Sequence, residues 1–387
     1  MSTVEAARQG LVSARLSRFP RGRLFGLLAE GAKYSAIDLA VGTPAAPETA
    51  PELIEAACRA LRGGTNQYGL PHGDPRLRQA IAARAGGDPE TGITVTAGAT
   101  EALAVAMLTL VDAGDEVILF DPGYENFLSA VAMAGAVPRY VPVAAPHWRA
   151  DPADLAAAFG PRTRAIVINS PGNPTGHIMS REELRQIAEL CERWDVALIA
   201  DEVYADFVFD GRSHLSAAAL PELAERTVVI RSLSKSHAVS GWRLGYLKAP
   251  ARLTPALREV HVAVAGMAAT PLQQAVAVAA AEPGFWALRD DLAVQRDIAL
   301  SALREMGAHC AAPEGGCYVM ADISPLTSED CEEFAFRTAR EAGVLLTPGK
   351  YFFSGAGERG DHLVRLAFNR SVSTMEEARG RLAAYVP

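Results

Sequence analysis

Lysine is scarce in this chain, and its scarcity narrows the possible chemistry. The 387 residues contain only Lys33, Lys235, Lys248 and Lys350, so a reaction that needs an amine nucleophile has few candidates. Long apolar runs are missing as well. No span reaches about 18 apolar residues without a polar break, and the N-terminal stretch lacks the continuous hydrophobic region of a signal peptide. We therefore expect a soluble, untargeted protein that does not bind membranes.

The chain also lacks an excess of positive charge, and its cysteines lack the spacing of a disulfide framework or a metal site. The formal net charge is −8 and no basic run occurs, which argues against a nucleic-acid or anionic-membrane partner and favours a small-molecule ligand. The cysteines are odd in number and lack CxxC or CxH spacing; they are Cys58, Cys191, Cys310, Cys317 and Cys331. This usage predicts reduced thiols in a cytoplasmic protein without a metal site.

Apolar segments typical of buried strands recur near residues 94, 117, 166, 198 and 229, and helical stretches separate them. This alternation predicts an α/β protein with a mostly parallel sheet and right-handed crossovers. Ligands of such sheets bind beyond the carboxyl ends of the strands. The helices that we expect span 51–62, 75–84, 97–111, 180–194 (with a Ser180–Glu183 capping box), 250–282, 283–306 and 329–342, and later strands span 317–321 and 362–368.

The stretch around Lys235 has the strongest chemical signal. A buried strand, residues 228–230, is followed by Ser232-Leu233-Ser234-Lys235. In extended geometry the two serines point the same way and Lys235 faces the other. Arg243 follows between two glycines, and its guanidinium suits a phosphate. Two hydroxyls, one amine and one guanidinium together favour a phosphorylated aldehyde as ligand.

Other polar residues follow the remaining strands. Gly98, Ala99 and Thr100 open a helix after a strand, where free N–H groups can bind an anion. Asp201 ends an apolar strand, where a carboxylate is costly to ionise unless a cation meets it. Arg365 lies in an apolar alternating strand and needs an anionic partner. That partner is either a substrate carboxylate or an internal Asp or Glu.

The motifs S-x-S-K, ending at Lys235, and G-x-R-x-G, around Arg243, resemble the lysine motif of the fold type I pyridoxal-phosphate (PLP) enzymes, specifically the class I and II aminotransferases. Residues 169–176 are similar to the family signature NPxGNPTG, with Ser170 where a proline often stands. The resemblance covers nearly the whole chain. It implies a large PLP-binding domain, residues 46–285, with a mostly parallel seven-stranded sheet flanked by helices. A small α+β domain, residues 286–387, would follow, with the arm 1–45 forming its start.

The resemblance also implies roles for individual residues. Lys235 would form a Schiff base with PLP and act as base at the substrate α-carbon. Asp201 would keep the ring nitrogen protonated, Tyr204 would donate to the phenolic oxygen and Tyr124 would stack on the ring. The further cofactor contacts would be Gly98, Ala99, Thr100, Asn173, Ser232, Ser234, Arg243 and, reaching across a homodimer interface, Tyr68; the substrate contacts would be Gly42, Asn173 and Arg365.

The implied function is transfer of an amino group between an L-α-amino acid and a 2-oxo acid. PLP-dependent lyases, elimination enzymes and cyclases are an alternative. Lyases that resemble this fold often carry His at the position of Tyr204, and α-oxoamine synthases tend to carry His at the position of Tyr124. Both tyrosines therefore favour transamination. A non-catalytic PLP sensor is a further alternative, although no DNA-binding domain fits before Ile37. The motif details look most like the subgroup that acts on methionine, glutamine, aromatic amino acids or succinylated diaminopimelate, and the substrate stays open.

Overall fold

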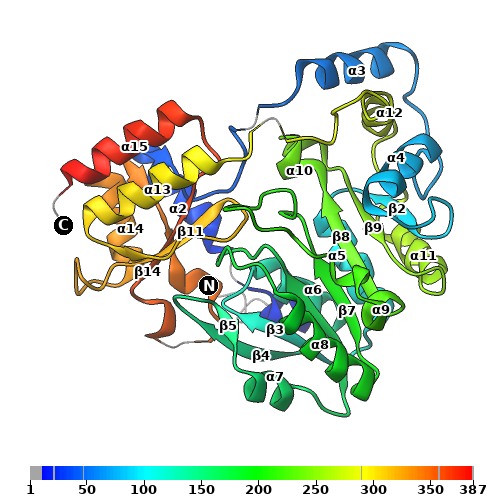
Figure 1. The fold of residues 1–387 in the computed structure, drawn as a ribbon, viewed down its shortest axis with the longest axis horizontal. Coiled ribbons are helices and arrows are strands. Elements are labelled where there is room, and N and C mark those ends of the chain that lie inside the picture. The colour runs from blue at the N-terminus through cyan, green and yellow to red at the C-terminus, as the bar shows by residue number, and fades with distance from the viewer. Residues whose placement is uncertain (1–10, 21, 47, 289, 356–357, 386–387) are drawn as a thin grey trace.

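An eight-stranded sheet forms the centre of the structure, a computed structural model that describes residues 11–385 apart from 21, 47, 289 and 356–357 (Figure 1). The strand order is β2 (Ile93–Thr96), β9 (Gly245–Lys248), β8 (Thr227–Ser232), β7 (Ala197–Asp201), β6 (Thr163–Asn169), β3 (Glu116–Asp121), β4 (Val137–Ala144) and β5 (Arg149–Ala150). β8, β7, β6, β3 and β4 run parallel, whereas β9 is antiparallel to both of its neighbours. The mostly parallel sheet is therefore confirmed, although the expected seven strands are joined by the short antiparallel β5.

Helices cover both faces of this sheet because its strands are apolar on both sides. Alternate strand residues point to opposite faces. Val117 and Leu119 pack with the helices that span Ala99–Leu110 and Glu125–Ala134, whereas Ile118 packs with those that span Pro152–Ala158 and Arg181–Trp194. The helices of this part are α3 (Pro51–Arg62), α4 (Pro75–Ala85), α5 (Ala99–Leu110), α6 (Glu125–Ala134), α7 (Pro152–Ala158), α8 (Arg181–Trp194), α9 (Pro221–Ala224), α10 (Leu233–Ser236), α11 (Thr254–Ala265) and α12 (Thr270–Ala279). The capping box predicted at the start of α8 is confirmed, because Ser180 and Glu183 bond each other's backbone N–H.

A smaller four-stranded antiparallel sheet lies in the C-terminal part of the chain, on the left in Figure 1. Its order is β10 (His309–Cys310), β11 (Tyr318–Asp322), β14 (Leu363–Ala367) and β13 (Thr347–Pro348). One hydrophobic core joins this sheet to α13 (Ala293–Met306), α14 (Cys331–Glu341) and α15 (Val372–Ala384). Its buried residues include Phe334 of α14, Leu366 of β14 and Leu382 of α15. Near the N-terminus, α2 (Arg23–Lys33) leads into β1 (Ile37–Asp38), which pairs with β12 (Val344–Leu345). Short 3-10 helices span Ala14–Arg18, Ala217–Ala219, Ser240–Trp242, Gly349–Phe352 and Glu358–Gly360.

Two expected helices differ from the structure. The helix predicted for 283–306 begins only at Ala293, because the Asp290 and Asp291 side chains accept the N–H groups of Leu292 and Ala293 and Leu292 is left-handed. The stretch 250–282 is two helices that break at Gly266, whose φ is 72°. Part of the N-terminal arm, residues 1–10, lies outside the described residues, and the domain boundaries near 46 and 286 stay a prediction.

Candidate active site

A cavity of about 220 Å³ opens beside the carboxyl ends of the parallel strands. Among the residues predicted for the site, those that line it are Gly42, Ala99, Thr100, Tyr124, Asn173, Asp201, Tyr204, Ser232, Ser234, Lys235, Arg243 and Arg365. Gly98 lies directly beside it, in contact distance of Arg243. Tyr68 is 93% exposed and does not line the cavity. One chain therefore brings together the predicted residues except the tyrosine that was expected to serve a partner subunit.

Lys235 lies in α10, a single helical turn that directly follows β8. The extended geometry expected for Ser232–Lys235 is therefore wrong: the N–H of Leu233 bonds the distant Leu244 carbonyl, and Ser232 caps the turn by accepting the Ser234 N–H. The Lys235 Nζ donates a hydrogen bond to the Gly42 carbonyl oxygen at 2.6 Å. Burial lowers the pKa of Lys235, which raises the share of neutral amine that can act as nucleophile or base.

An anion cradle forms where α5 begins. Gly98 has φ +85°, and a Cβ there would lie 2.5 Å from Arg243 Nη2, so the guanidinium packs against bare glycine backbone. Arg243 donates to the Ser240 carbonyl, and no carboxylate among the described residues pairs with it. Free N–H groups at the start of a helix and an unpaired guanidinium are a favourable site for a phosphate.

Asp201 is a buried carboxylate that lacks a cation. Asp201 ends β7 and is 7% exposed, and its carboxylate accepts a hydrogen bond from the Val203 N–H at 3.2 Å. Among the described residues no positively charged side chain pairs with it. Burial therefore raises the pKa of Asp201 to about 7. A protonated ring nitrogen in the cavity would supply the missing positive charge.

Tyrosines form the walls around this carboxylate. The hydroxyls of Tyr204 and Tyr318 lie 3.1 Å apart. Tyr124 stands at the N-cap position of α6, but its side chain makes no capping bond. Its hydroxyl instead accepts a bond from Asn126 Nδ2, and burial raises the pKa of Tyr124 to about 12. Its aromatic ring is thus a neutral wall of the cavity, which suits stacking on a flat ligand.

Arg365 closes the opposite side of the cavity. Its guanidinium lies between the rings of Tyr318 and Phe352, at 4.1 and 4.5 Å, and donates to Asn173 Oδ1 at 2.7 Å and to the Ala40 carbonyl. Its Nε is buried, and no described residue accepts a bond from it. The alternative of an internal ion pair is wrong for the described residues, because none places a carboxylate within ion-pair distance of Arg365.

Sequence reasoning missed several residues that line the cavity. They are Val41, Leu103, Glu125, Asn126, Asn169, Val203, Ser240, Tyr318, Thr347, Tyr351 and Phe352. Thr347 faces Arg365 across the β13–β14 register, and its hydroxyl lies 3.4 Å from the guanidinium. Asn126 could have been suspected because it follows the Tyr124 motif. The C-terminal residues carry no local signal, since only tertiary packing brings them to the sheet edge.

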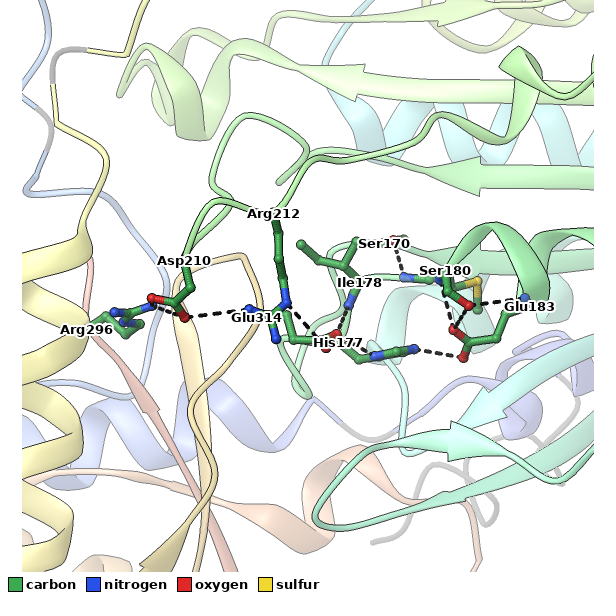
Figure 2. Close-up of polar contacts among 10 residues, drawn as sticks. Ser170, His177, Ile178, Ser180, Glu183, Asp210, Arg212, Arg296 and Glu314 are labelled. Atoms are coloured by element: carbon green, nitrogen blue, oxygen red, sulfur yellow. Dashed lines mark hydrogen bonds and ion pairs between the residues drawn. The ribbon is translucent and has the colours of Figure 1, made fainter.

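Figure 2 shows how the loop that carries Asn173 is attached to the C-terminal part of the chain. His177 lies between two carboxylates, with Nε2 at 2.9 Å from Glu183 and Nδ1 at 2.8 Å from Glu314. Glu314 also accepts the Ile178 N–H at 2.9 Å, and the Gly176 carbonyl accepts the N–H groups of Glu314 and Gly315. Residues 314–316 lead into β11 and Tyr318. These bonds therefore fix the position of the Asn173 loop relative to Tyr318, and both residues line the cavity.

The network extends beyond His177 on both sides. Burial opposes ionisation of Glu183, but bonds from His177 and Ser180 outweigh it and lower the pKa of Glu183 to about 2. On the solvent side, Arg212 lies 3.6 Å from Glu314, and Asp210 pairs with Arg296 of α13 at 2.9 Å. The network therefore runs from α13 to α8.

The residues present fit PLP. The cradle beside Gly98 has a shape and charge that suit a phosphate, the Asp201 carboxylate lacks a cation among the described residues, and Lys235 is a partly desolvated amine that lines the same cavity. No group of three or more His, Cys, Asp or Glu in the described part of the chain could hold a metal ion. Its described helices also include none that is both long and apolar enough to cross a membrane.

Comparison with known proteins agrees with this fit. Residues 34–382 match the family of class I and II aminotransferases, and the chain belongs to that family. It is 37% identical over 369 residues to a probable N-succinyldiaminopimelate aminotransferase of Mycobacterium tuberculosis, covering 91% of this chain and 92% of the relative. It is 35% identical over 327 residues to the methionine aminotransferase of Escherichia coli, covering 82% of this chain and 84% of the relative.

A solved structure extends the likeness to three dimensions. The N-succinyldiaminopimelate aminotransferase from Mycobacterium tuberculosis has a TM-score of 0.91 at 37% identity, and the match covers 96% of this chain and 99% of that one. The protein is therefore an aminotransferase that uses pyridoxal 5′-phosphate, rather than the lyase or the cofactor sensor that the sequence also allowed.

Replacing Asp201 with Asn should change how the cofactor-free protein responds to pH. The pKa of Asp201 is raised from 3.8 to about 7, so between these values the folded state keeps a proton that the unfolded state has lost. Stability therefore falls as pH rises through this window. We expect the Asp201→Asn protein to exceed the wild type in unfolding free energy by about 2–4 kcal/mol at pH 8 and by less at pH 5. Denaturant titration at both pH values measures this, and a gap that does not grow with pH would contradict it.

Replacing Glu314 with Ala should weaken substrate binding without loss of cofactor. The variant removes the partner of His177 and of the Ile178 N–H, which loosens the Asn173 loop. We expect the amino-acid KM to rise about tenfold, as loss of about 1.4 kcal/mol of binding implies. Arg212→Gln is the control, since its half-exposed pair with Glu314 contributes little. Equal KM values for all three proteins would refute the role.

Proposed function

We propose that Lys235, Asp201, Arg243 and Arg365 carry the aminotransferase reaction in the cavity described above. The observation that supports this most is their convergence on one cavity while the last three lack partners of opposite charge among the described residues. Each unpaired group matches one part of the ligands: Arg243 the phosphate, Asp201 the ring nitrogen and Arg365 the substrate carboxylate. Lys235 supplies the amine, and no other described lysine lines the cavity.

The reaction then follows from what each side chain holds or moves. When bound, pyridoxal phosphate supplies an aldehyde carbon for the amino group and a ring that accepts electrons from the substrate α-carbon. Arg365 and Asn173 orient the substrate carboxylate through bidentate, planar contacts. Lys235, with its lowered pKa, would remove the proton from the substrate α-carbon and deliver it to the cofactor carbon that had carried the aldehyde oxygen. Asp201 would hold a proton at the ring nitrogen, and Tyr204 would donate to the phenolic oxygen.

We also propose that the preferred substrates have long uncharged side chains. Beyond the groups assigned above, the walls include Val41, Tyr351 and Phe352, and the remaining carboxylate is Glu125. Glu125 is half-buried, and burial raises its pKa although Arg365 opposes this. An acidic side chain placed beside Glu125 would lack a cation among the described residues. The similarity to a methionine aminotransferase supports this preference.

We propose that the enzyme is a cytoplasmic homodimer. Tyr68 is 93% exposed, and nearby apolar residues Leu70, Val262 and Val264 are 51%, 46% and 48% exposed, which suits a surface that a second copy covers. All five cysteines are free, as a reducing compartment favours. Sedimentation at twice the chain mass of 41.0 kDa would support the dimer, and sedimentation as a monomer would reject it.

Replacing Lys235 with Ala should abolish turnover, because no other amine reaches the cavity in the described part of the chain. The control is Lys248→Ala, whose Nζ donates to the Ala85 carbonyl away from the site. A single-turnover assay for the 2-oxo acid and for pyridoxamine phosphate measures the effect. Turnover by the Lys235→Ala protein at the wild-type rate would refute the assignment.

Substrate choice can be tested with a set of amino acids on the purified holoenzyme. Methionine and phenylalanine should exceed aspartate in kcat/KM by at least about tenfold, because burying an unpaired charge costs more than about 1.4 kcal/mol. Glu125→Gln should narrow this ratio by improving the aspartate reaction. Preference of the wild type for aspartate would contradict the proposed substrate class.

A further inference from the structure

A buried histidine joins α11 to the loop and the turn beside the anion cradle. His261 is 0% exposed. Its Nδ1 lies 2.5 Å from Glu101 Oε1, and its Nε2 lies 2.8 Å from the Pro71 carbonyl oxygen. Pro71 comes three residues after Tyr68. The imidazole ring therefore contacts α5 on one side and the Tyr68 segment on the other.

These partners require a proton between His261 and Glu101. The Pro71 carbonyl only accepts, so Nε2 must carry a hydrogen. Nδ1 then faces a carboxyl oxygen at 2.5 Å, which is a close contact only if one of the two groups carries the shared proton. The pair is thus neutral overall. Burial alone would lower the pKa of His261, but the bond to Glu101 outweighs it and raises that pKa; Arg258, and His72 from the adjoining loop, are the other charged or titratable groups that face the ring.

Glu101 in turn holds the turn that forms the cradle. Its Oε2 accepts the Ala97 N–H at 2.5 Å, and Thr96 Oγ1 donates to the Gly98 carbonyl at 3.1 Å. Ala99 and Thr100, which line the cavity, follow directly. Without His261, the Glu101 carboxylate would be a buried negative charge one residue from Thr100, where a phosphate must bind. Two negative charges this close, the carboxylate and the phosphate, repel each other strongly in a protein interior.

We propose that His261 is a positioning residue for the cofactor phosphate, acting through Glu101: it neutralises this carboxylate and so keeps the turn Ala97–Thr100 able to bind an anion. The inference rests on the proposed phosphate site at Arg243 and Gly98. It assigns a role to the His261–Glu101 pair, which lies outside the cavity lining. The role predicts that charge balance, and not the imidazole itself, is what cofactor binding requires.

The test measures binding of pyridoxamine phosphate, which Lys235 cannot hold covalently, so that phosphate and ring contacts dominate. We expect His261→Gln to raise the dissociation constant at least about tenfold, since it leaves Glu101 uncompensated. The double variant His261→Gln with Glu101→Gln removes both charges and should return the constant to within about threefold of wild type. The readout is equilibrium dialysis at pH 7.5, with thermal unfolding recorded in parallel.

Arg258→Met is the matched control. Arg258 lies one turn earlier on α11 and ties it to β2, through Thr94 Oγ1 at 3.1 Å and the Ile93 carbonyl at 2.8 Å, without contacting Glu101. It should lower stability while leaving the dissociation constant unchanged. If His261→Gln does not fold, Glu101→Gln alone decides, because its amide can still bond both the Ala97 N–H and His261 and should keep wild-type affinity.

Three results would overturn the inference: wild-type affinity in His261→Gln, failure of the double variant to recover, or an equal loss of affinity in Arg258→Met. Weak binding by Glu101→Gln would also count against it. A wild-type protein that binds no pyridoxamine phosphate would instead refute the proposed phosphate site, so the two failures are distinguishable.

Discussion

The active site depends on one electrostatic constraint: a carboxylate at the carboxyl edge of the large sheet and a guanidinium on the small sheet are both buried, and the described part of the chain pairs neither with an opposite charge. Asp201 ends β7 at 7% exposure, and Arg365 lies in β14 at 4%. An uncompensated buried charge costs several kcal/mol. The raised pKa of Asp201 is a direct sign of that cost. In the function that we propose, a protonated ring nitrogen and a substrate carboxylate supply the missing charges, so one constraint accounts for the binding of both ligands.

The fold meets this constraint by joining two sheets. The parallel strands place Asp201 and Lys235 at one edge, whereas the C-terminal sheet supplies Arg365 and Tyr318. The contact between the two parts is itself polar, with His177 between Glu183 and Glu314. Small residues let the backbones meet there, since a Cβ at Gly176 would lie 2.4 Å from Pro313. We propose that the substrate carboxylate binds here, where residues from both parts are held together.

Much of this could be predicted from the sequence because the signals are local. Apolar runs mark β6, β7 and β8, and the polar residues at or after their ends, Asn173, Asp201 and Lys235, must fall at one edge of a parallel sheet. The helical turn at Ser232–Lys235 could not be predicted, because it depends on a bond from Leu233 to Leu244.

Tyr318, Thr347 and Phe352 line the cavity only because distant segments of the chain pack together. No local sequence pattern predicts such contacts. The start of α13 at Ala293 depends on two aspartate side chains that compete with helical bonding. The role of Tyr68 depends on a second chain, so neither the sequence nor a single copy of the fold tests it.

We propose that Lys235 is the amine that meets the cofactor aldehyde. Borohydride treatment of the holoenzyme, followed by digestion and mass spectrometry of the peptides, tests this assignment. We expect the reduced cofactor on the peptide that contains Lys235. The cofactor attached instead to Lys33, Lys248 or Lys350, or no attachment at all, would contradict it.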